Sequence, residues 1–211
     1  MHPNNRLHLW LVPTGIALTF VAYFMVWMPN QAAALSIIGQ EIGEWVKFLP
    51  EVRARQVALG RNWFYAPPLT LATLTLLWTR GWASRWQSWL MRLVAFVLCW
   101  PAVPVITLIL NEPRSEWLLR VGLVAAIAIL SLAVGWLERL TPHVVIGSVC
   151  LLGIFGGLMP LLAYLVHRPI ITQYLNAPVG VGIGVWANLI GHLLLCSGVS
   201  LDARRDISQS V

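Results

Sequence analysis

The chain has 211 residues, of which 58% are hydrophobic and only 10% are charged. This composition lies outside the range of soluble globular domains and predicts an integral membrane protein. The formal net charge is +6, and the basic residues are scattered in ones and twos between apolar runs. Such scattering is typical of the flanks of transmembrane helices, not of a surface that follows nucleic-acid phosphates. We therefore expect no nucleic-acid partner.

Apolar runs divide the chain into about six predicted membrane spans, each long enough to cross the hydrocarbon core of a bilayer. The first run is longer than the apolar core of a signal peptide, so we expect it to be retained as a span. The third run contains Pro101 and Pro104, which predict a kink in the middle of the membrane. The predicted spans are 7–28, 63–79, 88–110, 116–137, 142–166 and 178–201.

Residues 31–62 form the one long polar segment of the chain. Within it, apolar residues such as Leu35, Ile38, Ile42 and Trp45 recur at steps of three and four residues. This period predicts an amphipathic helix over residues 35–49, which Pro50 ends. The predicted fold is therefore an all-α, polytopic transmembrane helical bundle with one interfacial amphipathic helix, built as a single integral-membrane domain over residues 1–211.

The charged side chains of the polar segment are the first candidates for a functional site. Glu41 and Glu44 are candidate catalytic acid/base groups, because a carboxylate near an apolar surface can have a raised pKa. Arginine matches phosphate oxygens with paired donors, and the same cations can pair with acidic groups of a partner subunit. The candidates for binding a partner or a phosphate are Lys47, Arg53, Arg55 and Arg61.

The run from Glu44 to Arg53 reads E-W-V-K-F-L-P-E-V-R. It resembles the E-x-x-Q-aromatic-(x)-L-P-x-R segment of VanZ-like membrane proteins, a family associated with glycopeptide-resistance clusters. Lys47 stands where that family has glutamine, and the family's later aspartate has no counterpart before Asn62. The resemblance covers about ten residues of the chain, and no function is carried over from it.

His192 is an ionisable residue deep in the last predicted span, in line with Gly184, Asn188 and Cys196 at four-residue spacing. An ionisable residue inside a membrane is a candidate functional group. One hypothesis makes His192 a cofactor-binding residue that holds a haem or a pigment. The alternative is a neutral histidine that hydrogen-bonds to another helix. The three cysteines lie inside apolar runs without metal-ligand spacing, so no metal site is predicted.

Several smaller patterns predict how the spans pack and where they end. Gly153 with Gly157, and Gly180 with Gly184, have the small-xxx-small spacing that lets helix backbones approach closely. Tryptophans near the ends of the runs, Trp10 and Trp27 for the first, are expected to form interfacial belts. Glu116 and Arg120 lie one turn apart at the start of the fourth span, and we expect them to pair with each other.

The predicted function follows from what the spans contain and lack. No carboxylate lies in the apolar core of any predicted span, whereas ion-coupled transporters generally place one there. No common ATP-binding, zinc-protease or serine-hydrolase motif occurs. The favoured function is a non-catalytic subunit or accessory protein of a membrane complex, with membrane lipid and other membrane proteins as partners. The alternatives are a membrane enzyme or carrier acting on a lipid-linked phosphate, and a haem- or pigment-binding subunit that uses His192.

The expected location is the inner, cytoplasmic membrane of a prokaryote. The basic residues divide equally between the two sides of the predicted topology, seven on each, so the positive-inside rule leaves the orientation open. If the long polar segment is discounted, the rule places both termini in the cytoplasm.

Overall fold

The computed structural model describes residues 7–29, 36–80, 82 and 85–209. It is about 80% helical with almost no sheet, which confirms the predicted helical class. In chain order the elements are α1 (Leu7–Phe24), β1 (Val26–Met28), β2 (Ile37–Ile38), α2 (Gly39–Val46), α3 (Pro50–Arg53), η1 (Arg61–Tyr65), α4 (Ala66–Trp78), α5 (Arg85–Cys99), η2 (Trp100–Ala102), α6 (Ile106–Asn111), α7 (Arg114–Leu132), α8 (Val134–Glu138), α9 (Pro142–Gly153), η3 (Ile154–Leu158), α10 (Met159–Leu175) and α11 (Ile183–Gln209).

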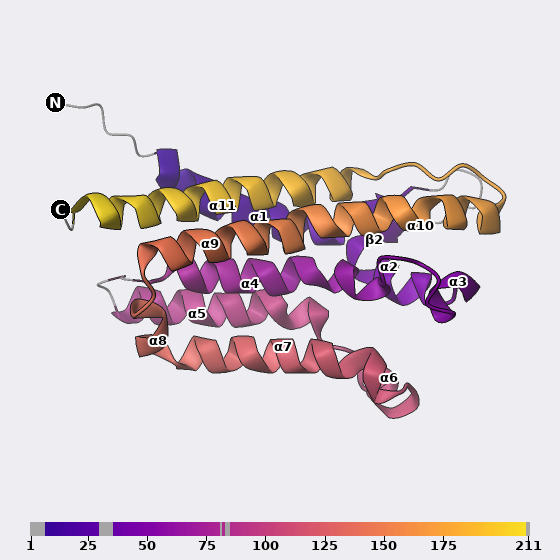
Figure 1. The fold of residues 1–211 in the computed structure, drawn as a ribbon, viewed down its shortest axis with the longest axis horizontal. Helices are drawn as coiled ribbons and strands as arrows, with labels where there is room; N and C mark the ends of the chain where they lie inside the picture. The colour runs from indigo at the N-terminus through magenta and orange to yellow at the C-terminus, as the bar shows by residue number, and fades with distance from the viewer. Residues whose placement is uncertain (1–6, 30–35, 81, 83–84, 210–211) are drawn as a thin grey trace.

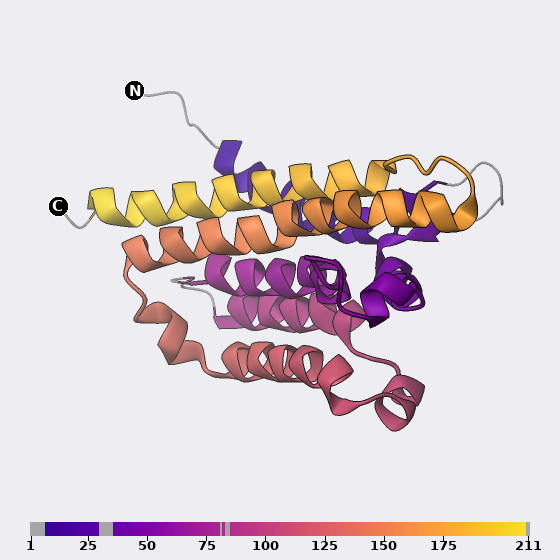
Figure 2. The same cartoon turned by 45° about the vertical axis from the view of Figure 1, so that its right-hand side comes forward.

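Helices α1, α4, α5 and α7, the joined α9–α10 helix and α11 run side by side along the long axis of the molecule (Figures 1 and 2). Helix α4 lies in the interior, where it contacts α1, α5, α7, α9 and α11. Its residues are almost all buried. Helix α11 contacts α1 over most of its length and α9 on another side. The first turn of α1 and the last turn of α11 lie at the same end of the bundle (Figure 1).

Three helical segments are long and apolar enough to cross a membrane, namely Arg114–Leu132, Pro142–Leu175 and Ile183–Arg205. The outer helices expose large apolar side chains, among them Leu93 and Val97 of α5 and Ile129 and Leu132 of α7. Soluble monomers rarely expose apolar surface on this scale, because water disfavours it. The long apolar helices and this surface are consistent with a membrane protein.

The third predicted span, 88–110, is not one helix. Helix α5 ends at Cys99, a short 3₁₀ turn follows, and a new helix begins at Ile106. Pro101 and Pro104 supply no amide hydrogen to the preceding turn, and the backbone at Val103 and Val105 is extended. The two prolines therefore break the helix where a kink was predicted. The remaining 15-residue helix α5 is about 22 Å long at 1.5 Å per residue, shorter than the roughly 30 Å hydrocarbon core.

The predicted helix over 35–49 is also shorter than expected. It begins at Gly39, because Ile37 and Ile38 instead pair antiparallel with Val26–Met28; residue 35 lies outside the described residues. Trp27 was expected in an interfacial belt, but it is 0% exposed. Its indole N–H donates to the Ala22 carbonyl at 2.9 Å. After α1 the chain thus enters a buried β pairing, where the sequence predicted the remainder of a span.

The helix Pro142–Leu175 passes through a π-helical turn, Ile154–Leu158, just before Pro160. Pro160 provides no amide hydrogen for the Gly156 carbonyl, which is four residues earlier. The Asn188 side chain of α11 donates to that carbonyl at 2.9 Å. A neighbouring helix therefore satisfies the backbone group that the proline leaves free, as is required where no water is present.

Glycines bring the helices into close contact, as the spacing of Gly153 and Gly157 predicted; Gly180, by contrast, lies before α11, which begins at Ile183 and not at residue 178. Gly153 lies against the Cys196 side chain and Gly157 against Cβ of His192, so a side chain at either position would meet α11. Gly184 packs on Trp27. Two further glycines of α11, Gly191 and Gly198, lie against α1.

Candidate functional site

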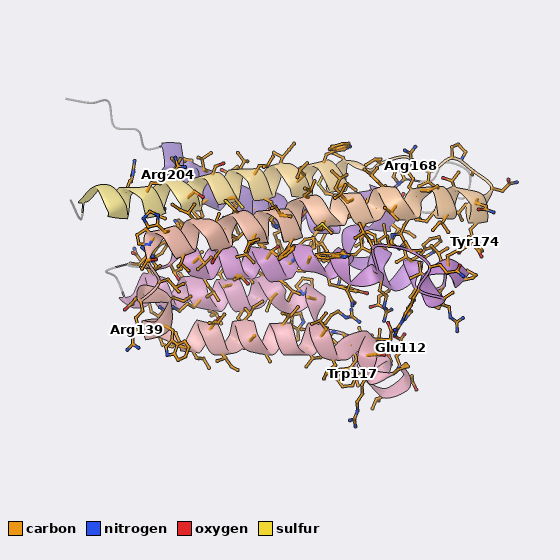
Figure 3. All side chains as sticks on the ribbon, in the orientation of Figure 1. Glu112, Trp117, Arg139, Arg168, Tyr174 and Arg204 are labelled. Atoms are coloured by element: carbon orange, nitrogen blue, oxygen red, sulfur yellow. The ribbon has the colours of Figure 1, made fainter. Side chains whose placement is uncertain are left out.

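Charged side chains from three separate parts of the chain meet at the end of the bundle opposite the start of α1. Figure 3 shows Glu112 and Trp117 at this end, whereas Arg139 and Arg204 lie at the other. The residues come from α2 and its C-cap, from η1, and from the α6–α7 connection with the first turns of α7. We call this set the charge cluster; its members are Glu44, Lys47, Arg61, Tyr65, Glu112, Glu116 and Arg120.

Glu44 lies at the centre of the charge cluster and accepts hydrogen bonds from three directions. The Tyr65 hydroxyl donates to Oε1 at 2.5 Å, and Nη1 of Arg120 donates to the same oxygen at 3.0 Å. The Lys47 ammonium donates to Oε2 at 3.1 Å and also to Oε1 of Glu112 at 2.6 Å. Helix α2 is thereby tied both to η1 and to α7.

Arg61 joins the other two carboxylates. Its Nη2 lies 3.0 Å from Oε2 of Glu112 and 3.0 Å from Oε2 of Glu116, and its Nη1 lies 3.7 Å from Glu44. The side chain is only 6% exposed. Its Nε and Nη1 nevertheless make no hydrogen bond. An arginine donor that is buried without an acceptor costs free energy, about 1–3 kcal/mol for a typical group.

Arg120 is more deeply enclosed, with 3% of the residue exposed. Its guanidinium lies 3.9 Å from the centre of the Tyr65 ring, close enough for a cation–π interaction. Its Nε and Nη2 have no hydrogen-bond partner, and neither does the buried hydroxyl of Tyr23. Tyr65 therefore contacts both members of the Glu44–Arg120 pair, one through its hydroxyl and the other through its ring.

Electrostatics fix the protonation states of the charge cluster. Burial opposes ionisation of Glu44, but hydrogen bonds from Tyr65 and Lys47 and the positive charges of Arg120 and Lys47 together outweigh burial, so the carboxyl pKa lies below its ordinary value. At Glu112 the hydrogen bonds from Lys47 and Arg61 likewise outweigh burial, and the pKa is lowered. Both carboxyls are thus ionised at neutral pH.

A cavity of about 600 Å³ opens beside the charge cluster. Its charged lining consists of four cations and two carboxylates, a net charge of +2; they are Lys47, Arg53, Arg55, Arg61, Glu112 and Glu116. A wall with excess positive charge favours an anionic ligand. The donors of Arg61 that lack partners belong to a side chain that lines this cavity.

Arg53 and Arg55 line the cavity from the end of α3. Arg55 adopts a left-handed backbone conformation with φ of 56°. The amide of Gln56 donates to the Glu51 carbonyl at 2.9 Å, and that of Arg55 donates to the Val52 carbonyl at 3.1 Å. This is the Schellman arrangement that ends helices, and glycine is the residue that usually occupies the left-handed position. Arginine holds that position at a cost of about 1–2 kcal/mol.

A second, apolar groove of about 400 Å³ lies next to the cavity, between α4 and α7. Leu69 and Thr73 line it from α4, and Leu123 and Ala126 line it from α7. Asn62 lines both the groove and the cavity. A charged compartment and an apolar compartment therefore share one boundary residue.

The structure brings together part of the predicted site. Glu44, Lys47 and Arg61 lie in the charge cluster, and Arg53 and Arg55 lie on the cavity wall. Glu41, by contrast, is exposed and is not among the residues that line the cavity.

The sequence reasoning missed Tyr65, Glu112, Glu116 and Arg120 as site residues. The expected pairing of Glu116 with Arg120 is wrong, because Glu116 binds Arg61 and Arg120 binds Glu44. A signal was present for two of them: Glu116 and Arg120 are four residues apart, which places them on one side of α7, whereas Glu112 precedes that helix. Their partners lie more than fifty residues earlier.

His192 lies in the bundle interior, away from the charge cluster. Its Nε2 is 2.9 Å from the Thr70 hydroxyl and its Nδ1 is 3.0 Å from the Asn188 carbonyl. Both ring nitrogens thus have hydrogen-bond partners, and an iron ligand would have to give up one of them. This geometry favours the helix-linking role of His192 over the cofactor-binding one.

Among the described residues, no group of three or more histidine, cysteine, aspartate or glutamate side chains is arranged to hold a metal ion. Comparison with protein-family models, with curated proteins and with solved structures finds no match to this chain. The charge cluster, the cavity and the groove are therefore the basis on which its function is inferred.

Proposed function

We propose that the protein is an integral membrane protein that binds the phosphate-bearing head group of a membrane lipid without transforming it. It would act alone or as an accessory subunit of a membrane complex. The main support is the cavity of about 600 Å³, whose charged lining carries a net charge of +2 and includes the buried side chain of Arg61. A phosphate offers several oxygens to the donors of an arginine, and the planar guanidinium matches them in pairs.

The rest of the cavity wall supports an anionic ligand as well. Arg53 and Arg55 are exposed and add two positive charges that the carboxylates of the cavity do not neutralise. Arg55 holds a left-handed position that glycine would occupy at less cost, and this strain motivates the hypothesis that its side chain has a role. We infer that Arg53 and Arg55 contact the outer face of the head group and that Arg61 contacts its inner face.

A binding role fits the carboxylates better than a catalytic one. Each of Glu44, Glu112 and Glu116 is paired with at least one cation. The pKa values of Glu44 and Glu112 are lowered by these contacts, whereas a general base works best with a pKa near the operating pH. The candidate acid/base role of Glu44 is therefore replaced in this proposal by a structural one, which holds Arg120 and Lys47 in place.

We further propose that α1, α4 and α5 cross the bilayer beside the three long helices, so that the chain forms one six-span domain. In this arrangement the charge cluster lies at one membrane surface, at the depth of lipid head groups, with α2 at the interface. The exposed Phe48, which lines the cavity, then faces the lipid. A ligand would reach the cavity from the membrane surface.

Binding of a phosphate-bearing lipid tests the proposal. The purified protein is placed in nanodiscs of phosphatidylcholine with or without phosphatidic acid, and its thermal unfolding temperature is measured. We expect phosphatidic acid to raise that temperature, because a ligand that binds the folded state stabilises it. Native mass spectrometry of the same samples counts the bound lipid.

Two cavity variants and one control make the test specific. Arg53→Gln and Arg55→Gly each remove one charge from the wall, and we expect each to weaken phosphatidic acid binding roughly tenfold, as for loss of a hydrogen bond to a charged group. Arg55→Gly also relieves the backbone strain, so the apo protein should be at least as stable as the wild type. Arg139→Gln, at the opposite end of the bundle (Figure 3), should bind like the wild type. Equal binding by all four proteins, or no binding by any, would overturn the proposed function.

A further inference from the structure

The apolar groove between α4 and α7 begins where the charged cavity ends. Asn62 is common to the linings of both. Near Asn62, the ring of Trp63 packs against that of Phe155 with 5.7 Å between the ring centres. Both residues line the groove. A molecule with its anionic end in the cavity would therefore place whatever is attached to that end at the mouth of the groove.

The walls of the groove are apolar along their whole length. Its two threonines both use their hydroxyl groups within the protein. The Thr73 hydroxyl donates to the Leu69 carbonyl at 2.9 Å, and the Thr70 hydroxyl lies 2.9 Å from Nε2 of His192. The groove thus offers a mainly hydrocarbon surface to its occupant, with Asn62 at the boundary with the cavity.

The groove also has the direction and length of a lipid chain. Its lining on α7 runs from Leu119 to Leu130, which is about 17 Å at 1.5 Å per residue, more than half of the roughly 30 Å hydrocarbon core. Leu119 is 56% exposed and Leu123 is 43% exposed. The groove is therefore open to the side, toward the lipid around α7.

We propose that this groove holds one hydrocarbon chain of the lipid whose phosphate occupies the cavity. The inference rests on the proposed function and narrows the class of ligand. The ligand is an amphiphile whose phosphate head lies in the cavity, on one side of Asn62, and whose chain lies along α7 in the groove, on the other side. The shared lining residue Asn62 and the net charge of the cavity are the reasons for this choice of occupant.

The test compares the head group alone with head groups that carry chains. Affinity is measured by calorimetry for inorganic phosphate and for a series of single-chain alkyl phosphates of increasing length, used below their micelle-forming concentrations. For the wild type we expect affinity to rise roughly tenfold or more across the series, because each methylene that enters the groove adds apolar burial. Prenyl phosphates form a second arm, which distinguishes a branched from a straight chain.

Two neighbouring alanines of α7 provide the variant and its matched control. Ala126 lines the groove and Ala125 does not, although both are exposed. Ala126→Phe fills the groove, so we expect it to bind inorganic phosphate like the wild type and to lose the gain with chain length. Ala125→Phe should retain that gain.

The outcomes separate the two proposals. Phosphate binding with no dependence on chain length in the wild type overturns the groove and leaves the proposed function standing. The groove proposal is also overturned, and the proposed function left standing, if Ala126→Phe keeps the full gain in affinity with chain length. That result would show that the chain contacts only the surrounding lipid. If neither phosphate nor any alkyl phosphate binds the wild type, the proposed function itself fails.

Discussion

Arg61 and Arg120 are the two most enclosed cations of the charge cluster, and each is held by a carboxylate from another part of the chain. Arg61 contacts Glu112 and Glu116, and Arg120 contacts Glu44. Removing one partner of a buried ion pair leaves a buried charge without compensation, which destabilises a protein more than the pair itself stabilises it. The charge cluster therefore links α2, η1 and α7 as well as forming one wall of the cavity.

Glu112→Gln tests this linkage, because Lys47 and Arg61 both lose a charged partner. We expect the variant to be less stable at neutral pH by about 1–3 kcal/mol. Since the pKa values of Glu44 and Glu112 are lowered in the fold, their stabilisation is present above the unfolded-state value of 4.5 and is lost as the pH falls through the folded-state values. At pH values below about 4.5, the unfolding temperature of the wild type should therefore decrease as the pH is lowered. The unfolding temperature of the variant should decrease less steeply.

The matched control for this measurement is Glu41→Gln, since Glu41 is exposed and lies outside the charge cluster. It should follow the wild-type pH profile. Parallel profiles for wild type and Glu112→Gln would show that Glu112 does not stabilise the fold through its charge.

At the scale of elements, proline decides where the helices break and neighbouring helices decide whether a break is tolerated. Pro101 and Pro104 end α5, and the chain there turns away into α6. Pro160 lies in a helix that continues, because Asn188 satisfies the Gly156 carbonyl and a π-helical turn absorbs the extra residue. The same residue type thus has opposite consequences in two helices, according to what packs beside it.

Gly156 gives this description a direct test. A Cβ atom at this position would overlap the Thr70 hydroxyl and the His192 ring, so we expect Gly156→Ala to destabilise the protein by about 1–3 kcal/mol through overpacking. Gly147 lies in the same long helix, and a Cβ atom there would meet no other atom of the described residues within 4 Å. Gly147→Ala should therefore be neutral or stabilising by up to about 1 kcal/mol. Thermal unfolding in detergent compares the two, and equal effects would contradict the packing described at Gly156.

For the molecule as a whole, the arrangement of the helices predicts the topology. The start of α1 and the end of α11 lie at one end of the bundle, and the charge cluster lies at the other (Figures 1 and 3). The number of membrane crossings is even if each of the long helices that run side by side spans the bilayer. Reporter fusions at the two termini should then report the same side of the membrane. Opposite sides would require that one of these helices does not cross.

From the amino-acid sequence alone one can predict a membrane protein, the helical composition and the approximate place of most helices, because these depend on local hydrophobicity and on proline. The sequence also indicates Glu44, Lys47 and Arg61 as site residues, since charge in an apolar chain is conspicuous. That Glu112, Glu116 and Arg120 complete the charge cluster is visible only in the folded chain, because their partners are distant in sequence and local spacing favoured a pair within α7. The same is true of Trp27, whose burial depends on a β pairing and on glycines of other elements. The groove beside α7 is likewise a feature that only the tertiary structure reveals, because it exists only where the surfaces of several helices meet.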